Sequence, residues 1–138
     1  MKRRTFHMPN DLRHVDRTVL SMKACVEPSL GASALLRFEI SVTEALVNLV
    51  KHATTSDAAA PIDIELHDAD NAVCVEICDP VGAAPFDVRD HAPSQNAADP
   101  LAENGRGLGL IVHCTDHIAY GPKADRMCLS LTISKSGD

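Results

Sequence analysis

Hydrophobic positions recur at helical spacing in two segments of the first half of the chain. Residues 33–53 carry apolar side chains three and four positions apart and are rich in good helix formers, which predicts a long helix. A shorter helix is predicted from a cap at Asn10 or Asp11 to about Val26. The apolar positions are Leu35, Phe38, Val42, Ala45, Leu46, Leu49 and Val50 in the long helix, and Val15, Val19, Leu20 and Met22 in the short one.

Alternating apolar and polar positions predict strands on either side of these helices. Two alternating segments flank the turn signal of residues 68–71 and predict a hairpin. Near the end of the chain, two further segments predict closing strands around a turn at Gly121 and Pro122. The predicted strands are residues 3–8, 62–67, 73–78, 118–120 and 127–133.

A long segment without apolar periodicity separates the hairpin from the closing strands. Residues 80–106 hold four of the eight prolines, and so long a loop in one domain is often a functional lid, here about residues 83–104. A short helix to about Asp116 follows. The 138 residues fit a single domain, 1–138. The order of elements predicts an α/β two-layer sandwich, with a mixed sheet covered by helices on one face.

Composition excludes several classes of function. The net charge of −6 lacks the basic footprint of a nucleic-acid binder, and 3% aromatic residues cannot build a base-stacking platform. No apolar run approaches the roughly 18 residues of a membrane span, and no secretory signal is expected. The five cysteines are odd in number and match no zinc spacing, so we expect reduced, mostly buried thiols in a cytosolic protein.

A polar stripe runs along the predicted long helix. Its members are three or four positions apart and therefore share one face: Ser41, Glu44, Asn48, Lys51 and His52. A solvated helix face is the ordinary explanation of such a pattern. Asn48, however, is a poor helix former placed in mid-helix. Together Glu44, Asn48 and Lys51 offer a general base, a metal-ligand oxygen and a cation for phosphate.

Two further signals concern an anion and an amine. Gly105, Gly107 and Gly109 alternate just before a predicted helix, where backbone amides can approach an anion, although the spacing fits neither the Walker nor the Rossmann pattern. A flexible loop with a helix start gives the same string. Asp79 ends a predicted strand close to Gly82 and could accept a hydrogen bond from an exocyclic amine such as that of adenine. Asp-Pro is also an ordinary turn initiator.

In their order and separation, these three signals resemble the N, G1 and G2 boxes of the GHKL ATPase superfamily. The phrase VTEALVNLVKHA and the small size resemble the bacterial anti-sigma-factor serine kinases of the RsbW type, over roughly residues 5–134. The resemblance implies a Bergerat, histidine-kinase-like ATPase fold that binds ATP and Mg²⁺. It implies a cytoplasmic protein whose partners are a sigma factor and a small STAS-type antagonist, without direct contact to nucleic acid or membrane. It leaves a homodimer open.

The resemblance also implies roles for individual residues. Glu44 would be the catalytic general base, Asn48 the Mg²⁺ ligand and Asp79 the reader of the adenine amino group. Ser130 or Thr132 could support the adenine site through water. The remaining ATP-binding positions are Lys51 for phosphate, His52 for phosphate or for helix packing, Gly82 in the G1 box, and Gly105, Arg106, Gly107, Leu108, Gly109 and Leu110 around the phosphates.

One departure from the superfamily keeps two functions open. The G1 box usually reads Asp-x-Gly-x-Gly, whereas here Gly82 is displaced by one position and the second glycine is missing. The first function is an enzyme, a serine/threonine-protein kinase that phosphorylates the antagonist and otherwise sequesters the sigma factor. The second is a binding module that holds a sigma factor or other regulator, with ATP structural or absent.

Overall fold

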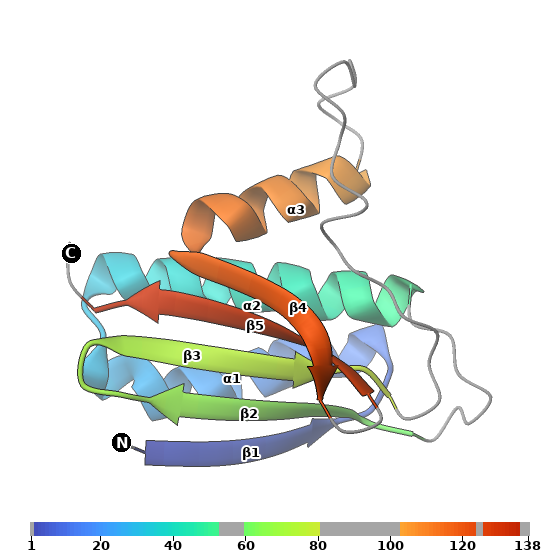
Figure 1. Ribbon diagram of the computed structural model, residues 1–138, viewed down its shortest axis with the longest axis horizontal. Coiled ribbons are helices and arrows are strands. Elements are labelled where there is room, and N and C mark those ends of the chain that lie inside the picture. The colour runs from blue at the N-terminus through green and yellow to red at the C-terminus, as the bar shows by residue number, and fades with distance from the viewer. Residues whose placement is uncertain (1, 53–59, 81–102, 124–125, 136–138) are drawn as a thin grey trace.

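The computed structural model describes residues 2–52, 60–80, 103–123 and 126–135, and the side chains of all of these except 52 and 103–108. Their elements form two layers, a five-stranded sheet and helices on one of its faces (Figure 1). This confirms the predicted α/β sandwich. In the described part of the chain, no helix is long and apolar enough to cross a membrane.

The sheet has the strand order β1-β2-β3-β5-β4. All four pairings are antiparallel, so the prediction of a mixed sheet was wrong in this respect. The physical reason lies between β1 and β2, where two helices of opposite direction bring the chain back antiparallel to its start (Figure 1). The strands are β1 (Lys2–Met8), β2 (Ile62–Asp68), β3 (Ala72–Cys78), β4 (His117–Lys123) and β5 (Arg126–Ser134).

Helices α1 (Val15–Val26) and α2 (Ala32–His52) lie behind the sheet in Figure 1, and α3 (Glu103–Cys114) lies beyond β4. Asp11 caps a 3-10 turn, Leu12–His14, that leads into α1, and its carboxylate accepts a hydrogen bond from the Arg13 amide at 2.9 Å. A second 3-10 turn, Glu27–Ser29, separates α1 from α2. The predicted helices are thus confirmed to within a few residues.

The alternation in the strands produces the core. Every second residue of β2, β3 and β5 is buried against the helices, which bury their own apolar stripes on the same side. The other face of the sheet carries the polar members of the alternation, and no described helix covers it (Figure 1). Fully buried side chains include Phe38, Val42, Leu46, Ile62, Val73, Val75, Leu131 and Ile133.

Two predicted boundaries differ from the structure. β4 continues through Gly121 and Pro122, which pair with Cys128 and Met127, so the turn predicted there was wrong. Proline is tolerated because β4 is an edge strand. The predicted helix after the glycines instead begins at Glu103, so the last two residues of the predicted lid, 83–104, belong to α3. The rest of the predicted lid, residues 83–102, lies outside the described residues.

The cysteines give a further correction. Cys78 and Cys128 are register partners on β3 and β5, their Cα atoms are 4.1 Å apart, and they form a disulfide. The expectation of five reduced thiols was therefore wrong for this pair, because residues 50 positions apart become neighbours only through the strand pairing. The remaining cysteines, Cys25, Cys74 and Cys114, are free.

Reduction of this disulfide should lower the free energy of unfolding. Cross-linking residues 50 positions apart restricts the unfolded chain, and a loop of this length corresponds to about 4 kcal/mol in the chain-entropy account. Urea unfolding with and without dithiothreitol measures the change. Cys25→Ala/Cys74→Ala keeps the bond and should retain the full response. Equal unfolding midpoints for the oxidised and reduced protein would contradict the expectation.

Candidate active site

Asp79 directly follows β3 and continues its alternation, in which Val73, Val75 and Ile77 face the helices. Its side chain is accordingly buried, with only 4% of the residue exposed. The Asp79 amide donates to the Met127 carbonyl at 3.0 Å, which extends the pairing with the neighbouring strand beyond Cys78. The candidate adenine-reading acid thus sits at the end of a central strand, on the helix-covered face.

The surroundings of Asp79 set its charge state. Burial raises the pKa of this carboxyl to about 6, although the Tyr120 hydroxyl and the charge of Arg126 act in the opposite direction. Tyr120 donates to Oδ2 at 3.4 Å, and Nε of Arg126 donates to the Asp79 carbonyl oxygen at 2.7 Å. The carboxyl therefore changes charge close to neutral pH.

Tyr120 and Arg126 were missed by the sequence reasoning. Tyr120 is the only tyrosine of the chain, and an aromatic ring with a polar tip commonly finds a partner when it packs in a core. That was a usable signal. For Arg126 the sequence holds no such signal, because its contact with the end of β3 exists only through the pairing of β3 with β5.

The polar stripe of α2 is only partly a solvated face. Ser41 and Asn48 are buried, with 0% and 7% exposed, whereas Glu44 is half-buried and Lys51 is exposed. Ser41 donates to the Phe38 carbonyl at 3.2 Å. His52 is the last residue of the helix, and its side chain lies outside the described part. Asn48, the poor helix former in the middle of this helix, is thus one of the two buried members of the stripe.

The glycine motif lies inside α3 and not before it. Because the helix begins at Glu103, its first unbonded amides belong to residues 103–106, at the positive end of the helix. The positions expected to surround the phosphates are thus distributed over the first turns. The side chains of Arg106 and Leu108 are not among those described, and Gly82 lies outside the described residues. Gly109 and Leu110 are exposed.

The fold brings the three motifs to one end of the molecule. The C-terminal half of α2, the end of β3 and the start of α3 all lie at the right-hand end in Figure 1. Arg37 near the start of α2 pairs at 3.3 Å with Asp116, just after α3, so the two helices run in opposite directions. The end of α2, which carries Asn48 and Lys51, consequently lies toward the beginning of α3.

The proposed support from Ser130 or Thr132 does not agree with the register. These residues pair with Glu76 and Cys74, and their neighbours Leu129 and Leu131 are buried on the other side of the strand. Both hydroxyls therefore lie on the open face of the sheet, opposite Asp79. The Tyr120 hydroxyl is the one that reaches the Asp79 carboxylate.

The donor set at this end of the molecule fits a magnesium nucleotide. Mg²⁺ takes oxygen ligands, and the Asn48 amide can offer one, with the Glu44 carboxylate one helical turn away. The exposed ammonium of Lys51 suits a phosphate. Asp79, once ionised, accepts a hydrogen bond from an amine. The types of polar group at this end of the molecule are therefore those that a magnesium nucleotide requires.

Asp79→Asn should stabilise the fold at neutral pH. The folded-state pKa of about 6 exceeds the ordinary value of 3.8. The contribution of protonated Asp79 to the free energy of unfolding is therefore fully present below about pH 4 and is lost as pH rises through 6. The difference of roughly two pKa units corresponds to at most about 3 kcal/mol at pH 7. Urea unfolding of both proteins between pH 4 and 7 checks this. A stability difference that does not vary with pH would contradict it.

Comparison with known proteins agrees with this geometry. A family model for the histidine kinase-like ATPase domain matches residues 8–133. Among solved structures, a chain of the crystal structure of the SiaB-SiaC complex from Pseudomonas aeruginosa is similar, with a TM-score of 0.58 and 12% identity. That match covers 95% of this chain and 89% of the other, and at this identity it supports the fold alone. No curated protein sequence matches the chain.

The family match runs from the last residue of β1 into β5 and includes every motif of the candidate site. The five-stranded antiparallel sheet with helices on one face is consistent with the Bergerat ATPase fold. The chain belongs to the histidine kinase-like ATPase family, within the GHKL superfamily.

Proposed function

We propose that this protein is an ATP-dependent serine/threonine-protein kinase of the RsbW type that acts as an anti-sigma factor in the cytoplasm. It phosphorylates a small STAS-type antagonist and otherwise sequesters a sigma factor. The observation that carries the proposal is the placement of a buried amide, Asn48, one turn from the carboxylate of Glu44, at the same end of the molecule as the buried Asp79.

In this proposal ATP is the substrate, and Mg²⁺, when bound, neutralises phosphate charge. Asp79 orients the adenine through its amino group, and Tyr120 holds the Asp79 carboxylate. Asn48 offers its amide oxygen to the metal, and Lys51 pairs with phosphate. Glu44 accepts the proton of the serine hydroxyl while that oxygen bonds to the γ-phosphorus and ADP leaves.

The half-buried position of Glu44 suits the role of a base. A carboxylate at the edge of the interior can meet a hydroxyl presented by another protein, whereas a fully buried one cannot. Asn48, one turn further along α2, is deeper and suits a group that a nucleotide reaches. In this proposal the more exposed side chain, Glu44, meets the protein substrate, and the more buried one, Asn48, meets the nucleotide.

A second candidate function is a binding module without catalysis. The altered G1 box, in which Gly82 is displaced and the second glycine is missing, favours it. The binding module differs from the kinase in two measurable respects. It captures its partner in the absence of ATP, and it never phosphorylates that partner.

A protein partner is supported by two observations. The similar solved chain comes from a structure described as a complex of two proteins. In this chain, α1 and the turn before it leave Leu12 48% and Leu20 62% exposed, while the apolar face of the helix is buried. We place the partner contact on this outward surface of residues 11–31. Lys23 on it already pairs with Glu39 at 3.1 Å, so the contact relies on the leucines more than on charge.

Glu44→Ala should retain ADP binding and lose phosphotransfer. General-base assistance contributes ~10²–10⁴-fold, so the rate of antagonist phosphorylation should fall by at least that order. Asn48→Ala should instead weaken the magnesium-dependent part of nucleotide binding. Radiolabel transfer from ATP and calorimetry with ADP separate the two variants. Asp70→Ala, which removes an exposed acid in the turn between β2 and β3, away from the polar stripe and from residues 11–31, is the control.

If Glu44→Ala phosphorylates the antagonist as fast as the unchanged protein, Glu44 is a surface acid. If ADP binds but neither the unchanged protein nor any variant transfers label, the protein is better described as a binding module.

Leu20→Asp should reduce capture of the antagonist and the sigma factor in a pull-down. Removing an apolar contact of this size and burying a charge instead typically costs about 2 kcal/mol or more at an interface centre. Val112→Asp, a similarly exposed position on α3, is the control and should leave capture unchanged.

The phosphorylated antagonist, which carries about 1.5–2 added negative charges, should no longer displace the sigma factor from this acidic chain. Equal competition by both forms would refute the switch.

A further inference from the structure

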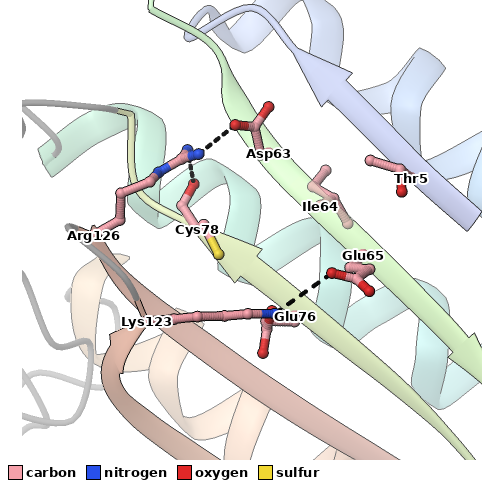
Figure 2. A pocket seen from close by; sticks show the side chains of 8 residues that line it. All are labelled: Thr5, Asp63, Ile64, Glu65, Glu76, Cys78, Lys123 and Arg126. Atoms are coloured by element: carbon pink, nitrogen blue, oxygen red, sulfur yellow. Dashed lines mark hydrogen bonds and ion pairs between the residues drawn. The ribbon is translucent and has the colours of Figure 1, made fainter.

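The Cys78–Cys128 disulfide lies on the open face of the sheet, away from the helices, between two hollows. A hollow of about 220 Å³ lies on the β2 side and is lined by Cys78 together with Asp63, Lys123 and Arg126 (Figure 2). A hollow of about 230 Å³ lies on the β4 side and is lined by Cys128. Each cysteine of the pair therefore borders a hollow of its own.

The disulfide is directly connected to the nucleotide site through the backbone. Cys78 and Cys128 are the last register pair of β3 and β5, and Asp79 is the next residue. The guanidinium of Arg126 donates to the carbonyl oxygens of Cys78 at 3.2 Å and of Asp79 at 2.7 Å. It also pairs with Asp63 on β2 (Figure 2). The same few backbone atoms thus carry the covalent link on one face and the adenine-reading acid on the other.

We propose that Cys78 and Cys128 form a redox modification site that exchanges with small thiols of the glutathione class, and that the oxidised form holds Asp79 in place for nucleotide. The inference rests on the proposed function in two respects, the nucleotide and the cytoplasmic location. Disulfides in cytosolic proteins are usually transient and catalytic or redox-sensing. A cytoplasmic kinase with such a bond next to its adenine site is therefore sensitive to the thiol pool.

The exchange begins at Cys78. Cys78 is half-buried, whereas Cys128 is 5% exposed, and Cys78 lines the hollow on the β2 side. A glutathione thiolate bonds to Sγ of Cys78, and Cys128 leaves as a thiolate that takes up a proton. A second glutathione thiolate attacks the glutathione sulfur of the mixed disulfide. Cys78 leaves as a thiolate that takes up a proton, glutathione disulfide is released, and two electrons have passed from two glutathiones to the protein.

A metal ion is a weaker occupant of the reduced pair. Glu76, Cys78 and Cys128 could place three ligand atoms within 4.8 Å of one another. The Glu76 carboxylate, however, already binds the ammonium of Lys123 at 2.6 Å, and this cation opposes the binding of another. The pair is thus better suited to thiol exchange than to holding a divalent cation.

The test measures ADP affinity by calorimetry in oxidised protein and in protein reduced with glutathione. Release of the end of β3 should weaken ADP binding about tenfold, which corresponds to roughly 1.4 kcal/mol. Cys78→Ser/Cys128→Ser should show the weaker affinity in both buffers. Cys25→Ser/Cys74→Ser/Cys114→Ser, which retains only the disulfide pair, should respond as the unchanged protein does.

A second readout does not need nucleotide. The Asp79 amide, which donates to Met127, should exchange its hydrogen about tenfold faster after reduction, since local opening sets this rate. If ADP binds equally in both redox states and amide exchange is unchanged, the inference is overturned while the proposed function stands. If neither state binds ADP, the proposed function fails and the nucleotide link with it. Faster exchange then still supports the modification site, and unchanged exchange refutes it.

Discussion

The pairing of β5 between β3 and β4 is the constraint on which the rest of the site depends. It supplies the Met127 carbonyl to the Asp79 amide, aligns Cys128 with Cys78, and places Arg126 over the end of β3. Through β4, its other neighbour, it also brings the Tyr120 hydroxyl to the Asp79 carboxylate. A change that shifts this register by one residue would exchange the two faces of β5 and separate all these groups.

Burial of the Asp79 carboxylate is unfavourable for the fold and useful for the site. Ionising a buried carboxyl costs stability, which is why its pKa is raised. The same dry surroundings strengthen any hydrogen bond that the carboxylate makes to an adenine amine. The Arg126 contacts and the disulfide keep the strand end in place despite this cost. The burial of Asp79 thus lowers the stability of the fold, and the contacts of Arg126 and the disulfide offset this loss.

Local patterns sufficed for the elements but not for their contacts. The strict alternation of β2 and β3 and the helical spacing in α2 predicted these segments closely, because each pattern lies within a few consecutive residues. The spacing of Glu44, Asn48 and Lys51 likewise placed them on one helix face. The disulfide, the contacts of Tyr120 and Arg126 with Asp79, and the face on which Ser130 lies all follow from strand pairing. Local periodicity does not predict which distant segments pair with one another.

The glycines at the start of α3 have an energetic consequence of their own. Gly105, Gly107 and Gly109 fall within the first seven residues of the helix, and each disfavours helix by about 1 kcal/mol relative to alanine. Together they bring the first turns close to the balance between wound and unwound backbone, a shift of about 3 kcal/mol or roughly 150-fold in population. A ligand with only modest preference for one state can therefore select it. In the proposed function, the nucleotide would therefore decide the conformation of the beginning of α3.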